Sequence, residues 1–175
     1  MIKNYINYPI TKNIIITTSR NSNNKTKTFT KILCSIIPSA IKIPRGNLKL
    51  SQLFQICYLK NFKVLIIVHE YQKNPNGLYL VYFTKGPIMY LKLSHLNMKN
   101  LSMNYKKKSI SYSGWRVIIK HNVNKKNYNI LQLFKNIFLN FNKCKNNILF
   151  LFFYKNCINI RCYLKYHLNK VIEVS

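Results

Sequence analysis

Two short apolar stretches that each run into a basic residue constrain the fold of this chain most strongly. Residues 14–18 are β-branched and lead into Ser19 and Arg20, and residues 40–43 lead into Arg45. The spacing between them leaves room for one helix, so the pattern predicts a strand, a helix and a second strand in a small α/β unit. Two such strand ends can share one rim of the unit. We therefore expect Arg20 and Arg45 at the same rim, together with backbone N–H groups.

The remaining periodicity fills out this unit and then repeats it in shortened form. Apolar residues recur at helical spacing from Phe29 to Ile37, and Pro38 ends that helix. Asn47 is a candidate N-cap for the next helix. The order of elements, β-α-β-α-β-β-β followed by β-α-β-β-β, predicts an α/β fold with open sheets and helices packed on them. The further expected elements are a helix over 50–57, a strand at 64–68, a turn at 74–77, strands at 78–83 and 88–93, and then a strand at 115–119, a helix over 130–141 and strands at 148–153, 158–164 and 171–174.

Length and composition set the expected domain organisation. A chain of 175 residues that is 48% hydrophobic can bury a sizeable core as one domain or as two half-domains that share it. The composition shifts predict a polar arm over 1–12, a first half over 13–93, a basic linker over 94–113 that contains Lys106 to Lys108, and an abbreviated second half over 114–175.

The charge balance points to a polyanionic partner. Lys and Arg number 29 against two acidic residues, Glu70 and Glu173, which gives a formal net charge of +27. A chain this basic repels itself and is attracted to polyanions, of which nucleic acid is the first choice. An anionic membrane surface is an alternative. Drift in an A/T-rich genome, which converts Asp to Asn and Glu to Lys, explains part of the excess without any polyanion.

Several function classes lack the residues that they need. The five Cys have no paired spacing, which disfavours a zinc site and indicates reduced thiols. His69 and Glu70 follow a strand but lack partners for catalysis, and metal-dependent phosphoryl transfer needs more carboxylates than this chain has. The N-terminus shows no secretory signal, and the longest apolar run, 148–154, is too short to span a bilayer. We expect a soluble protein that is not an enzyme and uses no metal, cofactor or small-molecule substrate.

The candidate RNA-binding residues gather where the first two strands end. Hydroxyl and free N–H groups at Thr18 and Ser19 suit a phosphate, and Arg20 can add a two-pronged contact. Lys25 and Lys27 follow on the next turn. The aromatic residues, 14% of the chain, fall mostly at core spacing and are interpreted as core rather than as base-stacking groups. The second strand end adds Arg45, Gly46 and Asn47, and strand alternation in the second half adds Arg116, Lys120 and Arg161.

An ordered set of short motifs resembles one known family. The set runs from Ile14 to Arg20 through Ile36-Ile37-Pro38-Ser39-Ala40, Arg45-Gly46-Asn47, Val64 to Glu70 and Asn74-Pro75-Asn76-Gly77-Leu78 to Lys85-Gly86-Pro87. In order and spacing it resembles the Brix-domain family of ribosome-biogenesis factors over about residues 12–93. The resemblance implies two similar, anticodon-binding-like α/β halves related by pseudo-two-fold symmetry, with RNA in the groove between them. It also implies that Arg20 and Arg45 hold basic rim positions.

Within that family the Thr-Thr-Ser-Arg, Arg-Gly-Asn and Val-His-Glu motifs look most like the member of the U3 small nucleolar ribonucleoprotein. This implies a role in pairing U3 small nucleolar RNA with precursor ribosomal RNA, with an S4-like protein and a large scaffold protein of the small-subunit processome as partners. The implied location is the nucleolus of a eukaryotic nucleus, such as a reduced nucleomorph. The Gly-Pro-Arg-Phe segment expected after Glu173-Val174 is absent, so the second half is expected to be shortened. A sister protein acting on the large subunit and a protein scaffold that binds little RNA are the alternatives.

Overall fold

The computed structural model describes residues 13–38, 40–83, 86–94, 96, 116–119, 125–138, 147–154, 157–165 and 171–174, and in most of the last three strands it describes the backbone only. The chain divides into two compact units whose main boundary falls between residues 96 and 97. The expected polar arm and nearly all of the expected linker lie outside the described residues. Among the described residues, no helix is long and apolar enough to cross a membrane.

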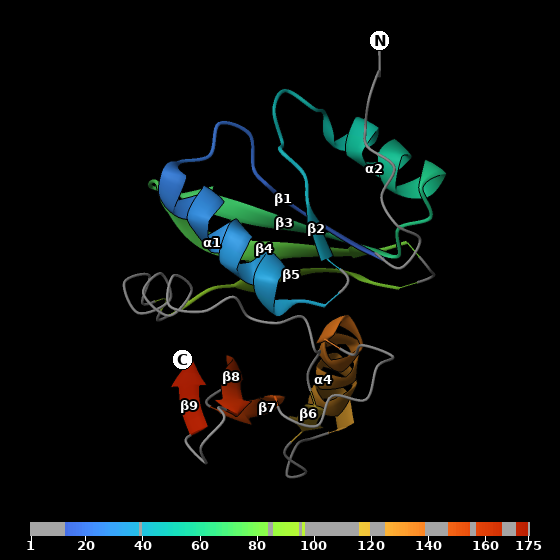
Figure 1. The fold of residues 1–175 in the computed structure, drawn as a ribbon. Coiled ribbons are helices and arrows are strands. Elements are labelled where there is room, and N and C mark those ends of the chain that lie inside the picture. The colour runs from blue at the N-terminus through green and yellow to red at the C-terminus, as the bar shows by residue number, and fades with distance from the viewer. Residues whose placement is uncertain are drawn as a thin grey trace. The chain divides into compact units, whose positions relative to one another are not determined.

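The first unit is a five-stranded sheet with a helix on each face (Figure 1). Strands β1 (Ile14–Thr18), β2 (Ala40–Lys42) and β3 (Val64–Tyr71) are parallel, and β4 (Asn74–Tyr82) and β5 (Ile88–Lys92) continue the sheet in antiparallel fashion, in the order β2-β1-β3-β4-β5. Helix α1 (Asn24–Ile36) connects β1 to β2, and α2 (Leu50–Leu59) connects β2 to β3. These two crossovers run in opposite directions along the sheet. Because parallel crossovers are right-handed, the two helices cover opposite faces.

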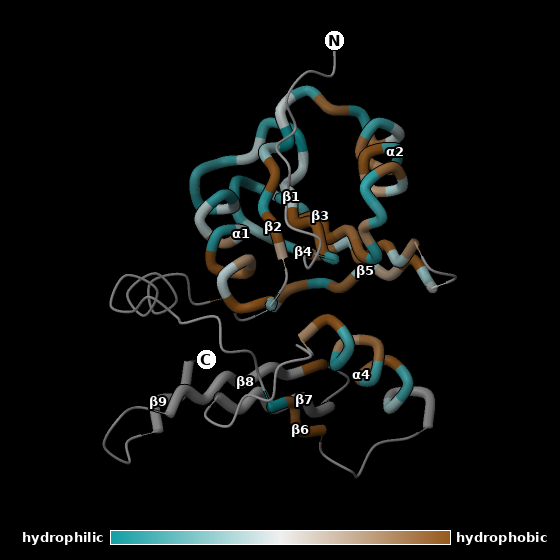
Figure 2. Tube along the Cα trace, turned by 45° about the vertical axis from the view of Figure 1, so that its right-hand side comes forward, coloured by the Kyte–Doolittle hydropathy of each residue, from teal (hydrophilic) through white to brown (hydrophobic). Residues whose placement is uncertain are grey.

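The core beneath α2 is apolar and closely packed. Figure 2 shows hydrophobic colour along β1, β2 and β3 at the centre of the unit, with hydrophilic loops around them. One side chain of the cluster is a thiol, Cys57, which is fully buried, and burial raises its pKa to about 12. Strand alternation brings the odd-numbered residues of β1, β3 and β4 to this face. The buried cluster comprises Ile15, Ile41, Ile43, Leu53, Cys57, Phe62, Leu65 and Val81.

Helix α1 covers the other face with Phe29 and Ile32, both of which are buried. Two threonines share this buried surface, and the Thr30 hydroxyl donates to the Thr26 carbonyl oxygen at 2.7 Å. The helix ends at Ile36, shortly before Pro38, as the sequence predicts. The hydroxyl therefore finds a partner inside the helix, which lets a polar residue occupy the interface with the sheet.

The turn predicted at 74–77 is wrong. The hairpin between β3 and β4 turns at Gln72 and Lys73, whose φ values are 48° and 61°, and residues 74–77 belong to β4. Pro75 fits in the strand because the register of β3 and β4 shifts between His69 and Glu70. A proline that lacks an N–H group is tolerated at such an irregularity in the ladder.

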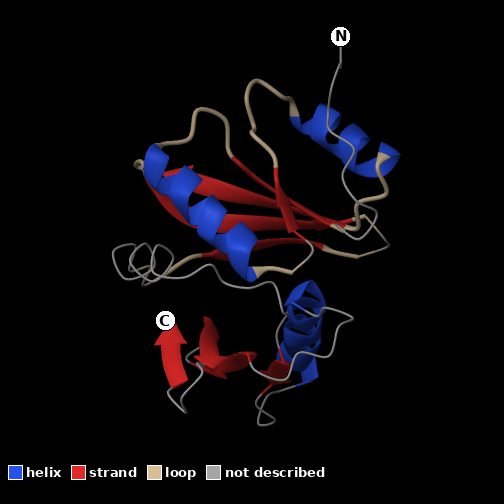
Figure 3. Ribbon diagram, viewed as in Figure 1, coloured by secondary structure: helices blue, strands red, loops and turns tan. Residues whose placement is uncertain are grey.

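The second unit repeats the core topology of the first with fewer elements. Strands β6 (Arg116–Ile119) and β7 (Asn147–Tyr154) are parallel and are connected through α4 (Lys125–Phe138), and β8 (Cys157–Lys165) and β9 (Val171–Val174) continue in antiparallel fashion. Helix α4 is amphipathic, and its apolar side carries four buried side chains, those of Leu131, Phe134, Ile137 and Phe138. The order β6-β7-β8-β9 matches β1-β3-β4-β5. Figure 3 shows that each unit combines helix and strand. The described residues of the second unit include no counterparts of β2 and α2, and the predicted α/β fold is confirmed.

Candidate nucleic-acid interface

The predicted rim lies at the carboxyl ends of the three parallel strands. Strand β1 lies between β2 and β3, so the segments that follow these strands emerge at one edge of the sheet. The segment after β2 is tied to β1 by two hydrogen bonds. The Thr17 hydroxyl donates to the Ile43 carbonyl oxygen at 3.0 Å, and the Ile43 N–H donates to the Ile16 carbonyl oxygen at 3.0 Å. These bonds hold the backbone that leads to Arg45 against the strand that leads to Arg20.

Arg45 is the most unusual side chain of this rim. Its Nε and Nη1 atoms are buried and have no hydrogen-bond partner among the residues that the structure describes. Burial lowers the pKa of Arg45, and the positive charge of the nearby Arg20 lowers this pKa further. A guanidinium remains charged in proteins and carries five N–H donors, so unpaired buried donors are costly. The Arg45 site therefore lacks an acceptor that an anion can supply.

The turn after Arg45 has the backbone shape expected of glycine. The Leu48 N–H donates to the Arg45 carbonyl oxygen at 3.2 Å, and Gly46 within that turn has a φ of 49°. Gly46 and Asn47 are both exposed, in agreement with a place on the rim. Asn47 does not cap α2, contrary to the expectation, because the helix begins at Leu50 and Lys49 is its N-cap residue. The Lys49 N–H donates instead to the Gln52 side-chain oxygen at 2.8 Å.

The hydroxyl and N–H groups predicted at the first strand end are already engaged. The Ser19 N–H donates to the Val68 carbonyl oxygen at 2.9 Å, which extends the pairing of β1 with β3. The Thr18 side chain is buried, and its oxygen accepts a hydrogen bond from the Ser22 hydroxyl at 2.8 Å. The expectation of free N–H groups at this turn is thus wrong for Ser19. Arg20 is exposed and remains the side chain available at this position.

Glu70 occupies the start of α1. One of its carboxylate oxygens accepts a hydrogen bond from the Asn23 N–H at 2.7 Å, just before the first residue of the helix. A carboxylate there satisfies a backbone donor and complements the positive end of the helix dipole. This is the role of Glu70 that sequence reasoning missed. An anionic ligand at the same place would meet a negative charge, which leaves Arg20 and Arg45 as the candidate phosphate contacts of this rim.

We expect Glu70→Ala to lower the free energy of unfolding by about 1–2 kcal/mol, because the Asn23 N–H loses a charged acceptor in a partly buried position. Urea denaturation followed by circular dichroism measures this change. Glu70→Gln is the matched control, since it keeps a side-chain oxygen, and its loss should be clearly smaller. Equal midpoints for the wild-type protein and Glu70→Ala would contradict a structural role for this carboxylate.

The predicted lysines lie on two different parts of the first unit. The Lys25 ammonium donates to the Asn74 side-chain oxygen at 3.3 Å, at the hairpin between β3 and β4. Lys27 is exposed and acts electrostatically on Lys42, whose pKa is lowered by burial first and then by Lys31 and Lys27. Lys27, Lys31 and Lys42 therefore form a second basic group. Sequence reasoning missed Lys31 and Lys42. Two signals point to them: Lys31 lies four residues after Lys27 on the same helix, and Lys42 alternates with the buried Ile41 on β2.

The predicted basic residues of the second unit are only partly described. Arg116 is exposed at the start of β6. Arg161 lies in β8, paired with Phe150 of β7, so one strand separates the backbones of Arg116 and Arg161. Lys120 lies outside the described residues. Among the residues that the structure does describe, no group of three or more His, Cys, Asp or Glu could hold a metal ion.

The comparisons with known proteins identify relatives. No family model matches the chain. Ribosome production factor 1 of Xenopus laevis is 28% identical over 134 residues, which cover 77% of this chain and 39% of the relative. The U3 small nucleolar ribonucleoprotein protein IMP4 of Bos taurus is 31% identical over 87 residues, which cover 50% of this chain and 30% of the relative. The matches thus cover less than half the length of either relative.

Two solved archaeal structures share the fold. A probable ribosomal biogenesis protein from Aeropyrum pernix K1 aligns with a TM-score of 0.57 and 16% identity, covering 91% of both chains. Mil, an archaeal Imp4-like protein, aligns with a TM-score of 0.55 and 12% identity, covering 92% of this chain and 97% of Mil. These alignments extend over both units. The sequence relatives and the shared fold together confirm the predicted resemblance: the chain is similar in sequence to ribosome production factor 1 and to IMP4, and it shares its fold with the two archaeal proteins.

Proposed function

We propose that this protein is an RNA-binding assembly factor and not an enzyme. In this role it helps U3 small nucleolar RNA pair with precursor ribosomal RNA during early processing of the small-subunit RNA. Its basic side chains lower the repulsion between two RNA strands and hold them together, while RNA–RNA base pairing reads the sequence. The site of action is the nucleolus, and the protein partners are an S4-like protein and a large scaffold protein of the small-subunit processome.

The unsatisfied guanidinium of Arg45 is the observation that carries this proposal. Two arginines lie close enough at one strand edge for Arg20 to lower the pKa of Arg45. The acidic side chain described in this unit, Glu70, is engaged at the start of α1. A phosphate diester supplies a negative charge and several acceptor oxygens in the geometry that a guanidinium binds best. RNA phosphate is therefore the anion that fits both the rim and the net charge of +27.

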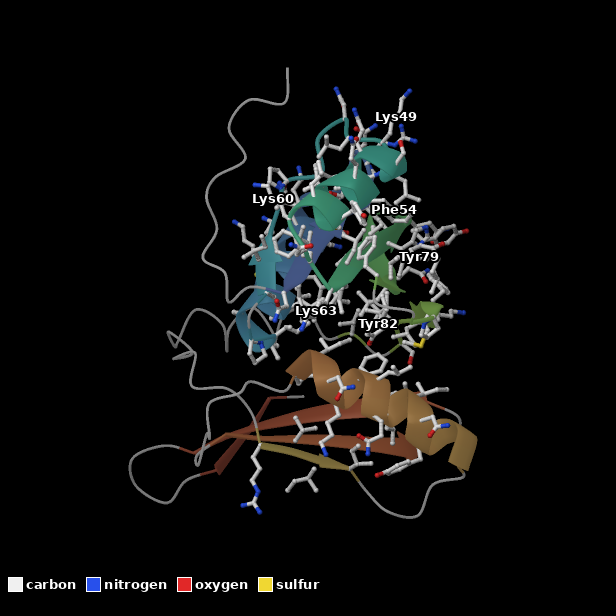
Figure 4. The ribbon with its side chains drawn as sticks, turned by 90° about the vertical axis from the view of Figure 1, so that its right-hand side faces the viewer. Lys49, Phe54, Lys60, Lys63, Tyr79 and Tyr82 are labelled. Atoms are coloured by element: carbon white, nitrogen blue, oxygen red, sulfur yellow. The ribbon has the colours of Figure 1, made fainter. Side chains whose placement is uncertain are left out.

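We expect Arg20→Ala and Arg45→Ala each to weaken RNA binding by about fivefold to tenfold, the cost of one charge-assisted contact. Fluorescence anisotropy with a labelled RNA oligonucleotide measures the affinity at one fixed salt concentration. Lys63→Ala is the matched control because Lys63 is exposed at the opposite end of β3, where Figure 4 labels it. Wild-type affinity in both arginine variants would remove the rim from the RNA site.

A second candidate function is that of a sister Brix protein in maturation of the large subunit. The extent of the sequence match favours a ribosome-biogenesis factor other than IMP4. Similarity to ribosome production factor 1 runs over 134 residues, against 87 residues for IMP4. Crosslinking and sequencing of RNA bound in cells separates the two. Crosslinks to U3 and the small-subunit precursor favour the first function, and crosslinks to the large-subunit precursor favour the second. Crosslinks at background level would favour a protein scaffold.

A further inference from the structure

Three aromatic side chains cluster on neighbouring strands of the first sheet. Tyr79 of β4 and Tyr90 of β5 are cross-strand partners whose ring centroids lie 4.7 Å apart. The His69 ring of β3 meets both edge-on, at centroid distances of 5.8 Å from Tyr79 and 6.1 Å from Tyr90. Figure 4 shows Tyr79 projecting away from the strands. The interpretation of the aromatic residues as core is wrong for the two tyrosines, which are 39% and 46% exposed.

This aromatic platform, defined as His69, Tyr79 and Tyr90, lies on the face of the sheet that α2 covers in part. Strand alternation places Tyr79 on the same face as Val81, which belongs to the buried cluster beneath α2. Gly77 leaves the space for the platform, because a Cβ atom at that position would overlap the Tyr90 ring. Along β4, this face of the sheet therefore changes from a core covered by α2, at Val81, to an exposed ring, at Tyr79. Exposed aromatic rings in contact with one another are typical of a binding surface.

The surroundings of the platform are basic. His69 lies near the carboxyl end of β3, next to the end of β1 that leads into Arg20. Lys92, which is exposed, lies two residues from Tyr90 on the same strand. The one acidic side chain described in this unit is Glu70, which lies next to His69 in sequence and binds the start of α1. A ligand of this face therefore combines flat apolar surfaces with negative charge.

The His69 ring supplies an independent sign of a missing partner. Its Nδ1 atom is buried and has no hydrogen-bond partner within the described part of the chain. Buried polar atoms are normally satisfied, so an unpaired ring nitrogen in this position calls for a donor or acceptor from a ligand. The edge of a nucleobase and a ribose hydroxyl both carry such groups.

We propose that the aromatic platform stacks unpaired nucleobases, so that the RNA held at the Arg20–Arg45 rim is single-stranded where it crosses β3, β4 and β5. This inference rests on the proposed function and adds the kind of RNA that the site takes. Every base has a π-face, so stacking on Tyr and His is tolerant of sequence. The rim contributes contacts to phosphates, and the platform selects splayed bases over paired ones.

The test compares two labelled RNA oligonucleotides of about twelve nucleotides with the full chain, using fluorescence anisotropy at one salt concentration. One is intact, and in the other four central bases are replaced by abasic units, so that the phosphates are equal in number. We expect the wild-type protein to prefer the intact RNA by about tenfold or more. The double variant Tyr79→Ala/Tyr90→Ala should lose that preference while binding the abasic RNA as the wild-type protein does.

Two controls distinguish stacking from a structural role. Tyr58→Ala removes a tyrosine of α2 that is 77% exposed and does not belong to the platform, and it should leave both affinities unchanged. Tyr79→Phe/Tyr90→Phe keeps the rings and should keep the preference for intact RNA. A double alanine variant that loses affinity for both RNAs by the same factor would overturn the inference.

The two proposals fail in different ways. Equal binding of both RNAs by the wild-type protein would overturn base stacking and leave an RNA-binding rim. Binding of neither RNA would overturn the proposed function and the platform with it.

Discussion

Raising the salt concentration from about 50 to about 200 mM should weaken RNA binding by this protein by about a thousandfold or more. Each phosphate that a basic side chain neutralises releases condensed counterions, and added salt opposes that release. Losses of this size arise from about six or more phosphate contacts. The first unit offers six cations for these contacts, since Arg20 and Arg45 at the rim are supplemented by Lys27, Lys31 and Lys42 and by the exposed Lys92 of β5. Anisotropy titrations at several salt concentrations give the slope of log affinity against log salt.

The slope also measures how much each basic residue contributes to the neutralisation of RNA phosphates. Arg45→Ala should lower its magnitude by a little under one, the value for one phosphate contact. Lys63→Ala, which removes the same charge from the other end of β3, should change it less. An affinity that is nearly independent of salt would contradict an electrostatic role for the net charge of +27 and would favour a scaffold that acts through proteins.

The rim could be predicted from sequence because it depends on topology. Parallel strands joined by helices place their carboxyl ends at one edge, and that rule alone brings Arg20 and Arg45 together. Whether the backbone N–H groups near this rim are free or already hydrogen-bonded could not be predicted in the same way. Glu70 reaches Asn23 from a position 47 residues later in the chain, so local patterns carry no sign of their hydrogen bond. The same holds for the predicted N–H group of Ser19, which donates to the carbonyl oxygen of Val68 on a strand much later in the chain.

The aromatic platform was missed for a related reason. Alternation correctly groups Tyr79 with Val81 on one face of β4, and from that grouping both residues look like core. Whether a residue on that face is buried depends on how far α2 extends over it. Periodicity fixes which face a side chain shares with its neighbours, but the area that a helix covers is a tertiary property. The turn at residues 72 and 73 was missed for the same reason, because its position depends on the register shift between β3 and β4, which is also a tertiary property.

Leu65→Ala should lower the free energy of unfolding by about 3 kcal/mol, which corresponds to about a hundredfold change in the ratio of folded to unfolded protein. Leu65 is fully buried in the cluster beneath α2 and lies on β3, the central strand of the sheet. The surrounding Ile15, Leu53 and Val81 come from two other strands and a helix. These elements cannot all move in to fill the space, so the variant loses transfer free energy and also retains a cavity.

Leu59→Ala makes the same chemical change on an exposed side chain of α2 and should alter stability by about 0.5 kcal/mol or less. Urea denaturation of the full chain, followed by circular dichroism, compares the two variants.

The comparison matters for function because β3 joins the core to the binding surface. Its first half fills the cluster with Leu65, while its last residues position His69 beside the tyrosines and Glu70 at the start of α1. Leu65→Ala should lose RNA binding only at urea concentrations at which the first unit unfolds. That result would show that the core supports the rim and the platform by holding β3 in place. Equal stability of the two leucine variants would mean that the cluster beneath α2 is not the core of the first unit.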